Sequence, residues 1–248
     1  MFKILSSALS FLSIIRLPFT PPVLTSEELA AGFSAFPLAG LILGGIYYTA
    51  AFCLRGHVPP LVLAALITAL MVVLTRGLHY DGLADLADGV WGGATPERRL
   101  EIMKDSRSGA FGVLALLLDL LLKVTSIHAL VLANSLTPIL FAPIFGRVAM
   151  TAAAYRATYA RAKGLGKPFL ENMLLPHLLI AVASAILFVA FINWRALFYA
   201  LPVLACVALL RTLANRLLGG ITGDVLGATC EITEIVVLVI ASSISFSA

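Results

Sequence analysis

The chain has 248 residues, of which 60% are hydrophobic and only 12% charged, and its mean hydropathy is +1.02. A soluble domain would carry about twice that charged fraction, so the composition excludes an ordinary soluble protein and predicts a polytopic membrane protein. The net charge of +4 predicts no nucleic-acid partner, because membrane proteins collect Lys and Arg in cytoplasmic loops and this chain does not interleave aromatic with basic residues.

The first element expected is a short helix at the N-terminus. Lys3 precedes an apolar run over 4–15, and Arg16 follows it without a small-residue cleavage site. The run is too short to cross a bilayer. We therefore expect residues 1–18 to form an interfacial segment, helical from Phe2 to Ile15, that stays in the mature protein.

Apolar runs of about the length that a membrane span needs then follow one another to the end of the chain. Proline and glycine separate them, and no internal repeat or soluble domain is evident. The fold class expected is all-α: one helical membrane domain over 1–248, with about seven transmembrane helices. The predicted spans are 31–54, 60–78, 109–132, 138–156, 174–193, 196–216 and 225–245.

Three substantial loops are expected on one side of the membrane, at 79–108, 157–173 and 217–224. Of the 17 basic residues, thirteen lie on or near this side, whereas Arg55 and Arg195 lie near the other and two fall inside spans. Because Lys and Arg are concentrated in cytoplasmic loops, these three loops are predicted to face the cytoplasm.

The 79–108 loop begins with three carboxylates at positions i, i+4 and i+7, namely Asp81, Asp85 and Asp88. On a helix they fall within roughly 60° of one another, and such a cluster needs a compensating cation. Mg²⁺, or Mn²⁺ as an alternative, suits carboxylates that share a metal with a substrate phosphate. Gly82 and Gly89 would let a substrate approach the backbone closely. The alternative is a solvated helix face.

A second polar island runs from Lys104 through Asp105, Ser106 and Arg107 to Gly109, just before a long apolar run. The free N–H groups of a helix N-terminus bind phosphate, and an Arg adds a bidentate donor. An ordinary helix cap by a serine, with the charges in solvent, explains the same pattern. The sequence does not choose between the two.

The last island carries Asp224, Glu231 and Glu234, which again share one helical face. Glutamates inside an apolar span are costly unless they are paired or bind a metal, so they indicate function. The alternative is a pair of neutral glutamates hydrogen-bonded inside the bundle.

Other polar residues fall within or beside the spans. Asp119 and Lys123 are spaced i, i+4 and are expected to neutralise each other, although Lys123 and Arg147 could instead face the acidic cluster or a phosphate. His79 borders the aspartates and either caps the helix or orients a phosphate or other ligand.

With these islands placed, the chain resembles the cobalamin synthase family, the adenosylcobinamide-GDP ribazoletransferases. The likeness covers nearly the whole length, and the order of the three polar islands is its most specific mark. The matching stretches are Ser10-Phe11 through Arg16-Leu17-Pro18, Phe36 through Gly40, His79 through Gly89, Glu101 through Gly109, Arg161 through Gly166, and Gly219 through Glu234.

The resemblance implies a reaction of the cytoplasmic membrane of prokaryotes. Adenosylcobinamide-GDP and α-ribazole, or its 5′-phosphate, would give adenosylcobalamin, or its 5′-phosphate, and GMP, with Mg²⁺ as cofactor. Whether the chain forms a homo-oligomer is left open.

Breaking a pyrophosphate in this way needs neutralised charge and an aligned hydroxyl. Asp81 and Asp85 would hold the metal, and Asp88 would take the hydroxyl proton or bind metal too. Arg107 and Lys104 would stabilise the departing GMP. The expected ligand-binding residues are His79, Asp105, Ser106, Asp224, Glu231 and Glu234.

Two other classes of protein use similar features. A CDP-alcohol phosphatidyltransferase would carry Asp-Gly-x-x-Ala followed by Arg, and this chain departs from that motif at Asp85. A polyprenyl transferase would carry a second aspartate-rich motif, which 224–234 resembles only loosely. An ion-coupled transporter would use the intramembrane acids, but inverted repeats or helices broken by glycine in mid-span are not clearly evident.

Overall fold

The computed structural model describes residues 2–17, 25–164 and 166–246, so both ends of the predicted 1–18 segment lie outside it. The described residues form helices and two isolated β-bridges and contain no strand, which confirms the all-α class. The elements are α1 (Phe2–Leu12), α2 (Ser26–Gly32), the 3₁₀ turn η1 (Phe33–Ala35), α3 (Phe36–Leu54), α4 (Pro60–Thr75), α5 (Leu78–Gly92), α6 (Pro96–Ile102), α7 (Ala110–Leu132), α8 (Thr137–Ala154), α9 (Lys167–Glu171), α10 (Leu175–Asn193), the 3₁₀ turn η2 (Trp194–Tyr199), α11 (Ala200–Leu218) and α12 (Gly223–Phe246).

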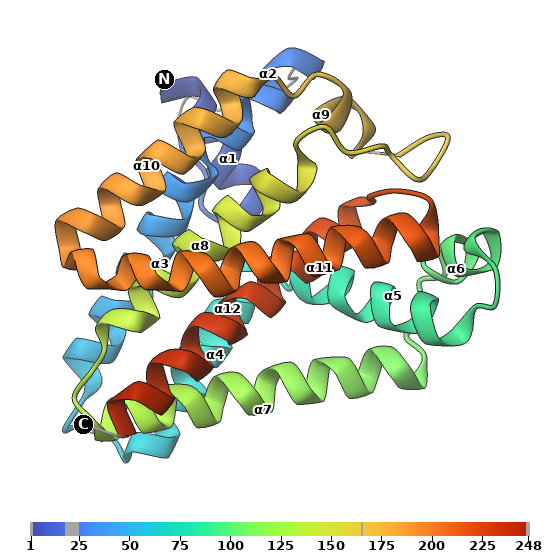
Figure 1. Cartoon of the computed structure of the whole chain (residues 1–248). Coiled ribbons are helices and arrows are strands. Elements are labelled where there is room, and N and C mark those ends of the chain that lie inside the picture. Colours follow the sequence, from blue (N-terminus) through green and yellow to red (C-terminus); the bar gives the residue numbers. More distant parts are fainter. Residues whose placement is uncertain (1, 18–24, 165, 247–248) are drawn as a thin grey trace.

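Five segments in the described chain are long and apolar enough to cross a membrane, or six if the bent pair α4–α5 counts as one span. The protein is therefore a multi-pass membrane protein, and the predicted number of seven spans is approximate. One of the five is the 44-residue stretch Leu175–Leu218, which holds α10 and α11 as two arms that meet at η2 (Figure 1). Each of the seven predicted apolar runs is mainly helical.

The second predicted span, 60–78, ends early. Arg76 and Gly77 have φ angles of 55° and 64°, in the left-handed region that commonly ends a helix, and the chain bends by 90° there. Helix α5 starts at the next residue. The predicted loop 79–108 is thus largely helical, since it consists of α5, a turn and α6 before it reaches α7.

Helices α8 and α12 form the centre of the bundle. About 78% of the apolar segment of α8 and 67% of that of α12 is buried inside the protein, against 28% for α7 and 17% for the α10–α11 stretch. Helix α3 lies directly against α8 because Gly40 and Gly44 place no side chain between the two helices. A Cβ atom at Gly40 would lie 2.5 Å from the Pro143 carbonyl oxygen, and one at Gly44 would lie 2.3 Å from that of Leu140.

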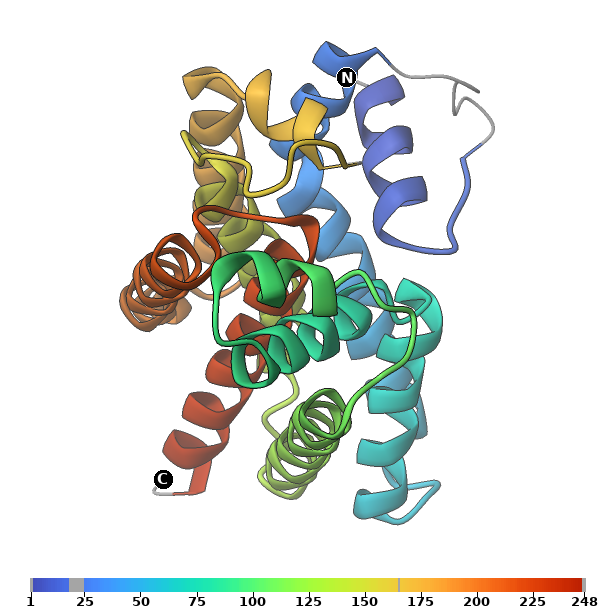
Figure 2. The same ribbon diagram turned by 90° about the vertical axis from the view of Figure 1, so that its right-hand side faces the viewer.

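The three segments predicted to share one side of the membrane meet at one end of the bundle. Arg99, in the first, donates to the carbonyl oxygen of Leu217 at 3.0 Å. Tyr159, in the second, forms a β-bridge with Ile221 in the third. Figure 1 shows α6, α9 and the turn between α11 and α12 toward the same end of the molecule, and Figure 2 views the bundle from that end. These contacts bring the three segments together at one end of the bundle.

Candidate active site

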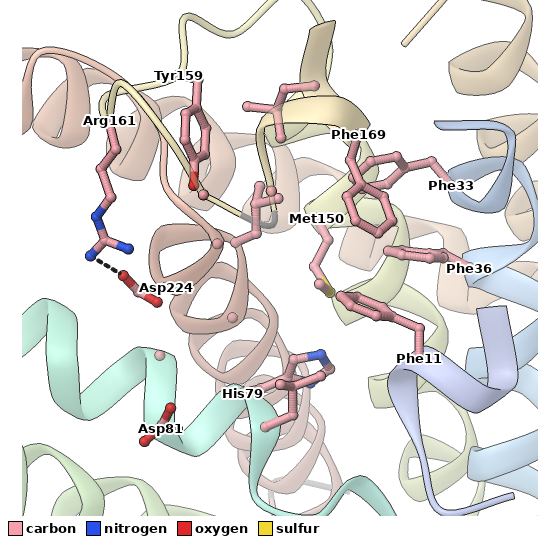
Figure 3. Close-up of a pocket in the computed structure, with 18 residues that line it drawn as sticks. Phe11, Phe33, Phe36, His79, Asp81, Met150, Tyr159, Arg161, Phe169 and Asp224 are labelled. Carbon is pink, nitrogen blue, oxygen red and sulfur yellow. Dashed lines mark hydrogen bonds and ion pairs between the residues drawn. The ribbon is translucent and has the colours of Figure 1, made fainter. Parts of the chain in front are cut away.

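A cavity of about 330 Å³ lies where α5 and the start of α12 meet the loop before α9. One end of it is polar and the other aromatic, with His79 between the two ends (Figure 3). The polar end is lined by Asp81, Tyr159, Arg161 and Asp224, and the aromatic end by Phe11, Phe33, Phe36, Phe169 and Met150. We call the polar end, together with the adjacent Asp85, the cavity mouth.

Glycines bring α5 and α12 together at this place. A Cβ atom at Gly82 would lie 2.8 Å from the backbone oxygen of Asp224, and one at Gly227 would lie 3.2 Å from the Cα atom of His79. Gly89 similarly makes room for the side chain of Met103. The prediction that a substrate approaches the backbone is therefore wrong for Gly89 in this conformation, whereas it stays a prediction for Gly82, which lines the cavity.

The three aspartates of α5 share a helix face but have different surroundings. Asp81 is exposed and lines the cavity, Asp85 is half-buried, and Asp88 is 7% exposed. The two carboxylate oxygens of Asp88 accept hydrogen bonds from the backbone N–H groups of Gly109, at 2.7 Å, and Gly112, at 2.8 Å. Asp88 therefore satisfies the N-terminus of α7, where the sequence pattern predicted either a phosphate or a serine cap.

An ion pair closes the cavity mouth. A guanidinium N–H of Arg161 donates to the Asp224 carboxylate at 2.7 Å, and the Thr222 hydroxyl donates to the same oxygen at 3.2 Å. Partial burial raises the pKa of Tyr159, so its hydroxyl remains protonated and can donate. No role was predicted for Arg161 or Tyr159 from the sequence. The only sign of a role in the sequence was that Arg161 begins the stretch, Arg161 through Gly166, in which the chain resembles the family.

The carboxylates of the mouth suit a divalent metal only in part. Among the described residues, no three His, Cys, Asp or Glu side chains converge closely enough to hold an ion by themselves. Asp81, Asp85 and Asp224 nonetheless lie near enough to repel one another, with Arg161 as their nearby cation. This donor set fits Mg²⁺, which is commonly held by one or two carboxylates together with substrate phosphates.

The loop between α6 and α7 holds the second polar island, and it does not line the cavity. Lys104, Asp105, Ser106 and Arg107 are all exposed. The Arg107 guanidinium donates to Asp105 at 2.7 Å and lowers the pKa of that carboxyl to about 2, so the pair stays charged at neutral pH.

A second, more open hollow of about 410 Å³ lies on the other side of α5 and reaches toward the α6–α7 loop. Arg76, Asp81 and Ser108 are among the residues that line it. Asp81 therefore borders both hollows, with the enclosed cavity on one side and the open hollow on the other.

Deeper in the bundle, five charged side chains from α7, α8 and α12 form what we call the buried network: Asp119, Lys123, Arg147, Glu231 and Glu234. Each is at most 3% exposed. Lys123 donates to Glu231 and lies 3.3 Å from Glu234 and 3.5 Å from Asp119. Arg147 pairs with Glu234. The structure confirms the expected pairing of Asp119 with Lys123 and places Glu231 and Glu234 far along α12 from the mouth residue Asp224.

His79 connects the two groups. Its side chain is nearly fully buried, it lines the cavity, and its Nδ1 atom lies 3.7 Å from a carboxylate oxygen of Glu231. Neither ring nitrogen has a hydrogen-bond partner among the described residues. The His79 ring is therefore an unpartnered polar group with which a ligand in the cavity could form a hydrogen bond.

Comparison with known proteins gives a consistent result. The sequence model of the family described as "Cobalamin-5-phosphate synthase" matches residues 4–242. A relative from Syntrophobacter fumaroxidans is 54% identical over 238 residues, which cover 94% of this chain and 95% of the relative. A relative from Desulfitobacterium hafniense is 41% identical, with 93% of each chain covered. A third, from Pseudomonas savastanoi, is 40% identical over a match that covers 93% of this chain and 95% of the relative. All three are named adenosylcobinamide-GDP ribazoletransferase. No solved structure matches the chain.

Proposed function

The chain belongs to the cobalamin-5-phosphate synthase family, and on that premise we propose that it joins adenosylcobinamide-GDP to ribazole at the cavity mouth. The family and the names of the relatives make it a membrane transferase of cobalamin synthesis. The preferred nucleoside is α-ribazole or its 5′-phosphate.

The position of Asp81 is the observation that supports a reaction at the cavity mouth. Asp81 borders both the enclosed cavity and the open hollow, so two substrates bound on opposite sides of α5 would meet at its carboxylate. The enclosed cavity of about 330 Å³ has the size of a site for a small ligand and suits the nucleoside, whereas the larger substrate can extend out of the open hollow.

The chemical step is an in-line phosphoryl transfer. A ribose hydroxyl oxygen of ribazole attacks the phosphorus of the phosphate that is attached to cobinamide. A new P–O bond forms, the pyrophosphate P–O bond breaks, and GMP leaves with the electron pair of that bond. The hydroxyl proton passes to a carboxylate of the mouth other than those that would hold the metal. Positioning and charge neutralisation supply most of the catalysis in such reactions.

The other residues of the mouth hold the reactants. Arg161 stabilises phosphate charge as a planar, bidentate donor, and it would exchange part of its contact with Asp224 for the substrate. His79 offers its unpartnered ring nitrogens to the ribose. Arg107 and Lys104, with Asp105 and Ser106, are proposed to contact the GMP portion from the exposed loop beside the open hollow.

Asp81 and Asp85 would hold Mg²⁺. When bound, the metal neutralises charge on the pyrophosphate and on the departing GMP. Asp88, first predicted as the general base, is instead proposed to position α7, because both of its oxygens already accept backbone hydrogen bonds. Glu231 and Glu234 are proposed to stabilise the bundle rather than to touch substrate, because Lys123 and Arg147 pair with them.

We further propose that the protein lies in the inner membrane of a prokaryotic cell and that the mouth faces the cytoplasm. The concentration of basic residues on this end of the bundle supports that orientation. In a variant whose three native cysteines are replaced, a cysteine at position 94 or 163 should react with an impermeant reagent only after the cells are opened. A cysteine at position 57, in the loop between α3 and α4, should react in intact cells. The opposite pattern would reverse the orientation.

The activity is tested with purified, detergent-solubilised protein supplied with adenosylcobinamide-GDP, α-ribazole and Mg²⁺. We expect GMP and a corrinoid product to appear in equal amounts, and chelation of the metal to stop both. GMP release without corrinoid product would indicate hydrolysis instead of transfer. No release from folded protein would contradict the proposed activity.

A further inference from the structure

Four phenylalanines from separate elements gather at the inner end of the cavity. Phe11 comes from α1, Phe33 from η1, Phe36 from α3 and Phe169 from α9. Figure 3 shows their rings together on the far side of His79 from Arg161 and Asp224. We call this group the aromatic end.

Most of the ring pairs are tilted or edge-on, as aromatic groups prefer, and Phe11 and Phe36 are nearly parallel, at 16° and 6.3 Å. The ring centroids of Phe33 and Phe36 are 4.7 Å apart, and those of Phe11 and Phe169 are 5.2 Å apart. Phe33 and Phe169 are nearly perpendicular, at 83° and 6.0 Å. The side chains of this end present carbon and, from Met150, sulfur, so they offer a ligand apolar surface without strong hydrogen-bonding groups.

A void beside such a cluster is unusual if the rings serve only to fill the core. Protein interiors are packed to about the density of organic crystals, and few voids exceed one water molecule. The cavity here has about 330 Å³, and Phe11, at its rim, is 40% exposed. An apolar pocket with a few polar groups at one end is the usual form of a small-ligand site.

The chemistry of the two ends selects the ligand. A guanine base carries hydrogen-bonding groups on its edges, and burying them among phenylalanines would leave them without partners, which is costly. The base of ribazole is a methylated benzimidazole, a flat and largely apolar ring system that can stack on phenyl rings. The ribose of the same molecule is polar and would lie toward His79 and Asp81.

Resting on the proposed function, we propose that the aromatic end is the binding site for the base of ribazole and sets the preference for an apolar base. In this arrangement the ribose lies at the boundary between the two ends, with a hydroxyl directed to the cavity mouth. The GDP portion of the second substrate stays outside the aromatic end.

The test measures ribazole binding separately from turnover. Equilibrium dialysis with labelled α-ribazole gives its Kd for the wild type, Phe11→Leu, Phe169→Leu and the control Phe191→Leu, whose ring is 89% exposed on α10. We expect the Kd to rise about tenfold in the first two variants, the scale of one lost stacking contact, and to stay unchanged in the control. The KM for adenosylcobinamide-GDP should not change in any of them.

Because Phe11 is partly exposed, Phe11→Leu should fold, and gel filtration in detergent checks this. An unchanged ribazole Kd in folded Phe11→Leu and Phe169→Leu would overturn the proposal. Competition by guanosine for the ribazole site would also overturn it, since that would place a polar base there. Failure of the proposed function is distinct: the wild type would then bind no ribazole and form no corrinoid product.

Discussion

The cavity mouth and the buried network contain similar residues but differ in how their carboxylates are paired. In the mouth, Asp224 pairs with Arg161, whereas Asp81 is exposed and forms no ion pair among the described residues. In the buried network, Lys123 and Arg147 contact all three carboxylates, and the five side chains are nearly fully buried. The mouth can therefore accept a cation or a phosphate, whereas each carboxylate of the network already lies within ion-pair distance of a cation.

This difference shows that acidic residues in an apolar chain do not all indicate a reactive site. Glu231 and Glu234 are costly to bury alone, and the fold offsets that cost with two cations from α7 and α8. Asp81 lies at the end of the bundle where loops and cavities meet, and its exposed side chain is accessible to a ligand. Substitutions in the two groups test this division.

The buried network is expected to hold the bundle together. Lys123→Met would leave buried carboxylates without their shared cation, so we expect a loss of about 3 to 5 kcal/mol in the free energy of unfolding. Thermal unfolding in detergent measures this. The matched control is Lys167→Met, which removes a partly exposed pair with Glu171 and should change stability by less than about 1 kcal/mol. Equal effects of the two variants would show that burial of the network does not matter.

Asp88 separates a positioning role from a chemical one. Asp88→Asn removes the charge that accepts two backbone hydrogen bonds from α7, so stability should fall by about 1 to 3 kcal/mol. The exposed control Asp105→Asn should be nearly silent in the same unfolding measurement. If stability is unchanged while kcat falls by roughly 10²-fold, the general-base role predicted from the sequence is correct after all.

The smallest effect is expected at the exposed loop. Arg107→Lys keeps the charge but loses the planar pair of donors, so the KM for adenosylcobinamide-GDP should rise by about three- to tenfold. Arg98→Lys is the matched control, because Arg98 is also exposed and pairs with a nearby acid, Glu101. An unchanged KM in both variants would remove the α6–α7 loop from the substrate site.

Much of the fold could be predicted because span helices are local features. The apolar runs reach about the length of a bilayer, and proline at the start of α4 and α8 marks two boundaries. Helix α5 was not separated from the loop because its glycines and aspartates are poor helix formers. Its contacts with α12 and α7, which no local pattern shows, stabilise it.

The candidate site was predictable only in part. The i, i+4, i+7 spacing placed Asp81, Asp85 and Asp88 on one face. It could not show that backbone N–H groups at the start of α7 would donate hydrogen bonds to both oxygens of Asp88. The same limit applies to Glu231 and Glu234, whose partners come from α7 and α8. The aromatic end joins four segments that are distant in the sequence, so it appears only once the chain is folded.

The most direct test of the division compares turnover with stability in Asp81→Asn. Purified wild type and variant receive adenosylcobinamide-GDP, α-ribazole and Mg²⁺, and corrinoid product is followed while unfolding is measured on the same samples. We expect turnover to fall by about 100-fold or more with an unchanged unfolding midpoint, because an exposed carboxylate at the reacting centre contributes to catalysis and little to folding. Near-normal turnover in the folded variant would contradict the assignment of the reaction to the cavity mouth.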